Sequence, residues 1–92
     1  MSTKTKNKEQ KIPKWFKGQI YEEGAKVKNP FSGSTYELTN VELSIYDFIM
    51  GSQMMFGSIA YNNVSAQQIR DFEKALYWFR ANNPRAYMVL LD

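Results

Sequence analysis

The chain has 92 residues and a formal net charge of +3, and it contains neither Cys nor His. It therefore has no disulfide, zinc–thiolate site or thiol nucleophile, and it lacks both the commonest metal ligand and the commonest general base. The length fits one domain, and six Phe, six Tyr and two Trp make aromatic packing its main expected source of stability.

Charge is unevenly distributed along the chain. Residues 1–17 carry six Lys and one Glu, a net +5, whereas residues 18–92 carry six basic and eight acidic residues, a net −2. We expect residues 1–12, which are mostly polar, to form a disordered basic tail, and residues 13–92 to form a single globular domain. A nucleic-acid-binding fold usually carries positive charge on its folded surface, so the acidic body argues against one.

Three short strands are predicted after the tail, over residues 19–21, 25–28 and 34–38. Residues 25–28 alternate apolar and charged side chains, which is typical of a half-buried strand. Residues 22–24 are a predicted turn in which Gly24 is free to take a positive φ, and residues 29–33 form a second predicted turn. This small antiparallel meander needs helices against one face to be stable.

A helix is predicted to follow, because residues 39–42 form a capping box and apolar residues then recur with helical spacing. It should fray or stop near Gly57. Its apolar residues occupy two faces, so either it lies between the sheet and another helix or one face contacts a partner chain. The first face holds Val41, Ile45, Phe48, Ile49, Met55, Phe56 and Ile59, and the second holds Leu43, Tyr46, Met50 and Met54.

A second capping box at residues 65–68 starts another predicted helix, with one apolar stripe and an end near Asn82 and Asn83. Asn83 and Pro84 then predict an N-cap and the first residue of a short helix over 84–90. A strand through residues 87–91 is the competing prediction, because periodicity cannot separate the two in so short an apolar run. The predicted fold class is α+β: a small antiparallel β-meander followed by two or three packed α-helices.

No catalytic or metal-binding constellation emerges from the sequence, and no cofactor is indicated. A Ser-His-Asp relay is impossible without His, and residues 29–34 match neither phosphate-binding nor dinucleotide-binding patterns. Asp47 is the one carboxylate adjoining an apolar face, and an enzyme would be favoured only if it were buried beside a second carboxylate. We therefore expect a non-enzymatic protein.

Two sets of residues are candidate binding sites. The second apolar face of the helix after residue 39, and Trp78, which lies outside the apolar stripe of the next predicted helix, indicate either additional core or a protein interface. Such an interface would consist of Tyr46, Met50, Met54 and Trp78. The basic tail and its neighbouring ring indicate either a solubilising tail or a weak nonspecific nucleic-acid contact, which would consist of Lys4, Lys6, Lys8, Lys11, Lys14, Trp15 and Lys17.

Several segments of residues 13–92 together resemble small uncharacterised proteins of tailed phages that infect marine bacteria. They are residues 13–18, 29–33, 36–38, 42–48, 78–80 and 91–92. The resemblance implies a short accessory protein in a host cytoplasm, and it carries over no activity, cofactor or site residue. A cytoplasmic location also fits the absence of a signal-peptide pattern and of a membrane-spanning run. The expected function is a self-associating protein-interaction or structural module; the alternative is nucleic-acid binding through the tail.

Overall fold

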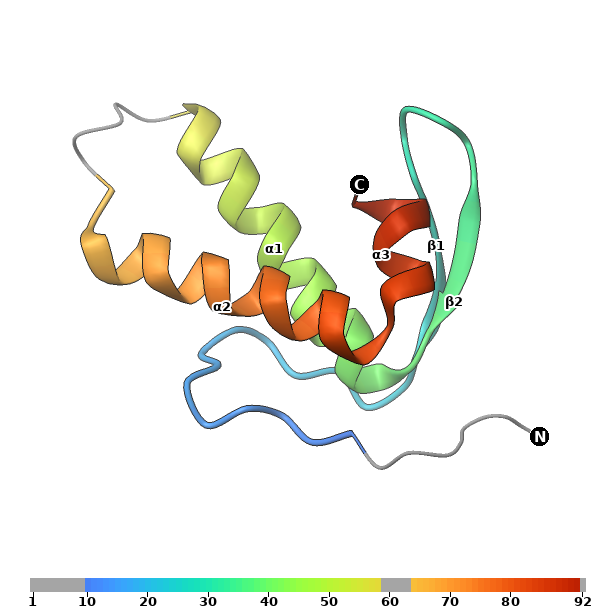
Figure 1. Ribbon diagram of the computed structural model, residues 1–92, viewed down its shortest axis with the longest axis horizontal. Helices are drawn as coiled ribbons and strands as arrows, with labels where there is room; N and C mark the ends of the chain where they lie inside the picture. The colour runs from blue at the N-terminus through green and yellow to red at the C-terminus, as the bar shows by residue number, and fades with distance from the viewer. Residues whose placement is uncertain (1–9, 59–63, 92) are drawn as a thin grey trace.

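The computed structural model describes residues 10–58 and 64–91. A two-stranded antiparallel sheet precedes three helices (Figure 1), which confirms the predicted α+β class. Most of the basic tail and of the loop expected between the two long helices lies outside the described residues. The elements in chain order are β1 (Ala25–Lys28), β2 (Thr35–Leu38), α1 (Asn40–Ser58), α2 (Ala66–Asn82) and α3 (Pro84–Leu90).

The hairpin of β1 and β2 matches two of the three predicted strands. Val27 pairs with Tyr36 on the half-buried face, and Lys26 pairs with Glu37 on the exposed face. The turn is organised by Asn29, whose Oδ1 accepts the backbone N–H of Phe31 at 2.8 Å. These contacts leave the Phe31 side chain 95% exposed at the turn.

The strand predicted over residues 19–21 is wrong. The backbone N–H of Tyr21 donates to Ser44 Oγ at 2.9 Å, and its carbonyl accepts from Asn40 Nδ2 at 3.3 Å. Both partners lie in the first turns of α1. Tyr21 therefore satisfies both of its backbone polar groups through side chains of α1 and not through pairing with a strand.

Gly24 does not use its freedom to take a positive φ, since Gly33 alone among the described glycines has one, at φ 81°. Gly24 is required for a different reason. A Cβ at this position would clash with the carbonyl oxygen of Leu38, in the facing strand. The residue thus allows the chain entering β1 to pass against the end of β2.

The helix termini follow the predicted caps. Glu42 N–H donates to Thr39 Oγ1 at 3.2 Å, while Thr39 N–H donates to a Glu42 carboxylate oxygen at 2.9 Å. Ser65 and Gln68 form the same reciprocal pair at α2. The final segment is a helix, because Asn83 ends α2 and its Oδ1 caps α3 through the N–H of Ala86.

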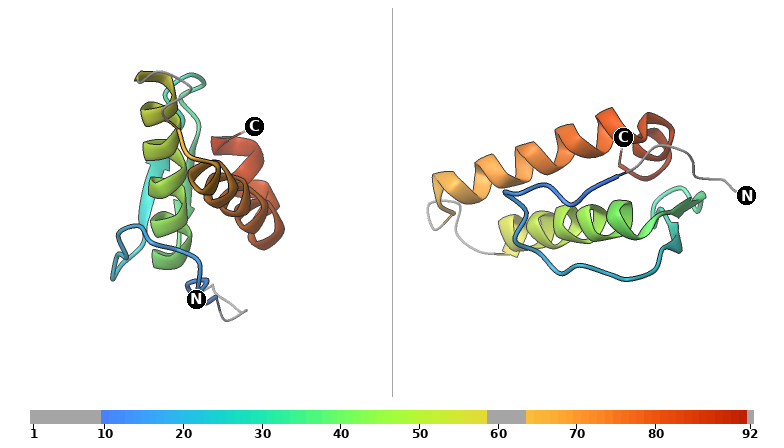
Figure 2. Two further views of the ribbon diagram at one scale, coloured as in Figure 1. Left: turned by 90° about the vertical axis from the view of Figure 1, so that its left-hand side faces the viewer. Right: turned by 90° about the horizontal axis from the view of Figure 1, so that it is seen from below.

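The core lies between α1, α2 and α3 and includes Leu38 of β2. α2 runs back obliquely across α1, and α3 packs beside β2 (Figures 1 and 2). Aromatic contacts join α1 to α2: the ring centroid of Tyr46 on α1 lies 6.3 Å from that of the buried Phe79 on α2. The buried apolar residues are Phe16, Leu38, Val41, Ile45, Tyr46, Ile49, Ala75, Phe79, Ala86 and Leu90.

The described N-terminal segment, residues 10–24, has no regular secondary structure but lies against both long helices (Figure 2, right). Its contacts begin at Gln10, whose Nε2 donates to Glu42 Oε2 at 2.8 Å. Phe16 anchors it further along, with its ring centroid 5.5 Å from that of Phe48 on α1. Among the described residues, Gln10 thus contacts the fold although it precedes Pro13 by three residues.

Within residues 10–58 and 64–91, no helix is long and apolar enough to cross a membrane.

Candidate functional site

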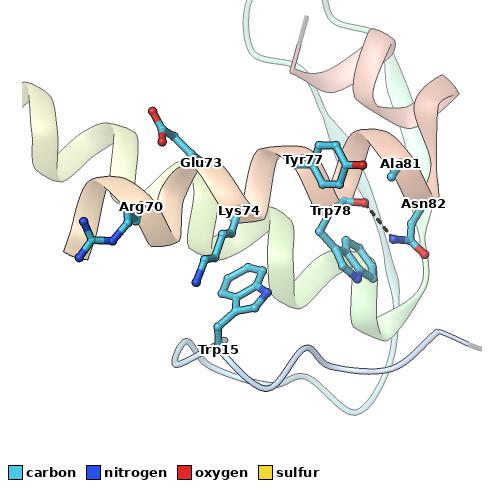
Figure 3. A pocket seen from close by; sticks show the side chains of 8 residues that line it. All are labelled: Trp15, Arg70, Glu73, Lys74, Tyr77, Trp78, Ala81 and Asn82. Carbon is cyan, nitrogen blue, oxygen red and sulfur yellow. Dashed lines mark hydrogen bonds between the residues drawn. The ribbon is translucent and has the colours of Figure 1, made fainter. Parts of the chain in front are cut away.

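An open groove of about 460 Å³ runs between the N-terminal segment and α2 (Figure 3). We call it the α2 groove. Trp15 contributes one side, and α2 contributes the other. Its lining residues are Trp15, Arg70, Glu73, Lys74, Tyr77, Trp78, Ala81 and Asn82.

Trp15 is positioned by a tight turn in the N-terminal segment. The backbone N–H of Phe16 donates to the carbonyl of Pro13 at 3.1 Å, and the Phe16 side chain is buried against α1. The Trp15 ring lies 6.2 Å from the Phe16 ring at an interplanar angle of 75°. Because its neighbour fills the core, Trp15 is left half-buried beside α2.

Trp78 is positioned by the period of α2. Phe79 is fully buried, so the preceding residue lies about 100° round the helix, at the border between core and solvent. Trp78 is accordingly half-buried, and Tyr77, one position further back, is 68% exposed. Asn82 Nδ2 donates to the Trp78 carbonyl at 3.0 Å, which places this amide at one end of the groove (Figure 3).

The charged lining residues are arranged asymmetrically. The Lys74 side chain extends toward Trp15, whereas Glu73 projects from the opposite side of α2 (Figure 3). Three lysines of the segment that carries Trp15, Lys11, Lys14 and Lys17, are exposed. The lining of the groove itself combines aromatic rings with two basic residues, Arg70 and Lys74, and one acid, Glu73.

The four residues predicted as a protein interface occupy different environments. Tyr46 is 8% exposed and packs in the core, where burial raises the pKa of its phenol. Met50 is half-buried against the core, while Met54 is 74% exposed on α1. Among the four, Trp78 alone lines the α2 groove.

The residues predicted to contact nucleic acid are only partly described. Lys4, Lys6 and Lys8 lie outside the described residues, and the other three lysines of that set are exposed. Trp15 lies opposite α2. One tryptophan from each predicted site thus lines the same groove, a juxtaposition that neither prediction contained.

Most of the groove's α2 side was missed from the sequence, although a signal for it exists. Arg70, Lys74, Trp78 and Asn82 recur at steps of four and so share one helix face. Tyr77 lies on the neighbouring row. A search for aromatic and basic residues on one face beside the apolar stripe would have found this set.

The carboxylates do not form a reaction centre in the described chain. Asp47 is exposed, and burial together with this carboxylate raises the pKa of Tyr21. Glu42 is buried, but its oxygens accept hydrogen bonds from Thr39, Gln10 and Asn83, so it has a structural role. Among residues 10–58 and 64–91, no group of three or more potential acidic ligands could hold a metal ion.

Comparison with known proteins assigns no family. No protein-family model, no curated protein and no solved structure matches the chain.

Proposed function

We propose that this protein is a small non-enzymatic interaction module that binds a chain-like partner in the α2 groove. The observation that carries the proposal is the convergence of Trp15 and Trp78, from opposite ends of the chain, on one open groove beside the exposed Tyr77. Trp, Tyr and Arg are the residues most enriched at the energetic centres of interfaces. An open groove between a helix and an extended segment suits a partner that lies along it.

The burial pattern supports a binding role for these rings. Both tryptophans pack against the core beside Phe16 and Phe79, but they are only half-buried and line the groove with the rest of their surface. The non-enzymatic part is supported by the absence of His and Cys from the sequence and by the exposure of Asp47. Self-association and a cytoplasmic setting stay predictions, and sedimentation of the full chain tests the first.

Parallel selections from a random linear-peptide library and a random single-stranded oligonucleotide library test the proposal. We expect one library to yield ligands that bind the wild-type chain and are weakened about 5-fold or more by Tyr77→Ala. Tyr77 is largely exposed, so this variant should fold. Phe31→Ala, which removes an exposed ring at the hairpin turn, is the matched control and should bind like wild type.

The proposal fails if neither library yields a ligand whose binding depends on the groove. It fails equally if Tyr77→Ala and Trp78→Ala, like the control Phe31→Ala, both leave binding unchanged. Circular dichroism of each variant establishes that a loss of binding is not a loss of fold.

A further inference from the structure

We infer that the partner of the α2 groove is a single-stranded nucleic acid, with bases stacked on Trp15 and Trp78 and phosphates beside Lys74 and the lysines of the N-terminal segment. The inference rests on the proposed function and adds the chemical class of the partner. It differs from binding by the basic tail alone, because it places the bases on rings that the fold holds in position.

Charge complementarity is the first argument. The described N-terminal residues 10–17 hold three lysines and no acid, and residues 64–91 hold four basic and two acidic residues. The intervening residues 18–58, which form the hairpin and α1, hold two basic and five acidic residues. The net negative charge of residues 18–92 thus conceals a separation of charge. The groove lies between two segments with net positive charge, residues 10–17 and α2. An anionic partner is favoured there.

Ring placement is the second argument. Trp15 is supported edge-on by the buried Phe16, and Trp78 is fixed on the helix face beside the buried Phe79. Bases stack on aromatic faces without sequence preference, because every base has a π-face. Two indoles on different elements, held by the core and flanked by Lys74 (Figure 3), are the combination that single-strand-binding proteins use.

The same features disfavour a duplex and an acidic peptide. Bases in a duplex are already stacked and paired, so they cannot reach the indoles without the cost of unstacking. An acidic peptide satisfies the lysines but leaves both tryptophan faces without a stacking partner. Single strands should therefore bind more tightly than duplexes of equal length, and more tightly than poly-glutamate of equal charge.

Intrinsic fluorescence provides a probe specific to the groove, because the chain has two tryptophans and both line it. We would titrate the full chain with oligothymidylate of about ten nucleotides, within the ~4–16 nucleotide range of single-strand sites. The expected result is saturable quenching of indole fluorescence. Affinity should fall with salt at a log–log slope of about −2, for about three phosphate contacts.

Variants separate stacking from charge attraction. Trp78→Ala should weaken binding about 5- to 150-fold. Lys74→Gln, which leaves the rings intact, should reduce the salt slope by about 0.7 while Lys74→Arg restores it. Phe31→Ala is again the control, and its affinity should match that of wild type. Trp78→Phe tests whether a smaller ring at this packed position retains both fold and binding.

The outcomes separate this inference from the proposed function. If oligothymidylate neither quenches nor binds, while peptide ligands still bind in a Tyr77-dependent manner, the nucleic-acid inference is overturned and the interaction module stands. If the oligonucleotide binds without indole quenching and the Trp78 and Lys74 variants bind like wild type, the tail acts alone and the inference is likewise overturned. Poly-glutamate that quenches as strongly as oligothymidylate would assign the site to acidic polypeptides.

Discussion

Removal of the Glu42 side chain should destabilise the fold far more than removal of an exposed acid from its N-terminal half. Glu42 is only 4% exposed, and its carboxylate joins three parts of the chain. It accepts from Thr39 N–H at 2.9 Å, from Gln10 Nε2 at 2.8 Å and from Asn83 Nδ2 at 3.0 Å. The start of α1, the N-terminal segment and the α2–α3 junction are therefore held by one side chain.

The magnitude follows from these three contacts. Hydrogen bonds to a charged group contribute about 1.5–3 kcal/mol each, but the half-buried amides of Gln10 and Asn83 can turn partly to water. We therefore expect Glu42→Ala to lower the free energy of unfolding by about 2–4 kcal/mol, less than three independent bonds would give. Glu42→Gln keeps one acceptor for the cap but turns an N–H₂ group toward other donors, so an intermediate loss is expected.

Urea denaturation followed by circular dichroism measures this loss. In thermal unfolding, 2 kcal/mol should lower Tm by at least about 8 °C for a domain of this size. Glu23→Ala removes an exposed acid from a turn and should stay within about 0.5 kcal/mol of wild type. If Glu42→Ala is no more destabilising than Glu23→Ala, the carboxylate does not join these segments and the reasoning is refuted.

Two further predictions concern the backbone and the core. Gly24→Ala should destabilise the protein by more than about 1 kcal/mol, because its Cβ would meet the Leu38 carbonyl. Gly51→Ala, which has open space for its Cβ within α1, should stabilise the protein by about 0.5–1 kcal/mol. Equal effects of the two variants in urea denaturation would contradict the close approach at Gly24. Burial raises the pKa of Tyr46 above its ordinary value of 10.0, so its unfolded form loses the proton first. Stability should accordingly be intact below pH 10.0 and fall as pH rises through the higher pKa of the folded state. Tyr46→Phe should reduce that alkaline loss, and an unchanged pH dependence would contradict the assignment.

The helices could be predicted because their signals are local. The capping boxes at Thr39 and Ser65 and the Asn83–Pro84 pair each define a boundary within four residues of sequence, and all three occur as expected. The choice between helix and strand for the last segment was left open by its apolar pattern. Asn83 decides it, since its side chain caps the N–H of Ala86.

The conformation of residues 19–21 and the role of Gly24 could not be predicted, because both depend on contacts between residues that are distant in sequence. Residues 19–21 have the composition of a strand, but the Tyr21 backbone is paired by Asn40 and Ser44 of α1. The local sequence indicates only that Gly24 is free in φ, whereas its role depends on the Leu38 carbonyl in the facing strand. Neither partner can be identified from the local pattern.

The two tryptophans of the candidate site could be predicted from the sequence, but their meeting in one groove depends on contacts between distant residues and could not. Trp15 and Trp78 were each singled out, one for nucleic acid and one for a protein partner, yet only the fold brings them to one groove. Averaging charge over residues 18–92 also concealed the basic character of the part that contains α2. Charge counted by helix face would have shown it.

The most direct test of the α2 groove is a nitrogen–proton correlation spectrum of the full chain, recorded as single-stranded oligothymidylate is added. The two tryptophans give two indole N–H signals, and both lie in the groove. We predict that both signals shift together with the backbone amides of Lys74 and Tyr77, while the amide of Phe31 stays in place. Shifts confined to the N-terminal lysines, with both indole signals unmoved, would contradict the account.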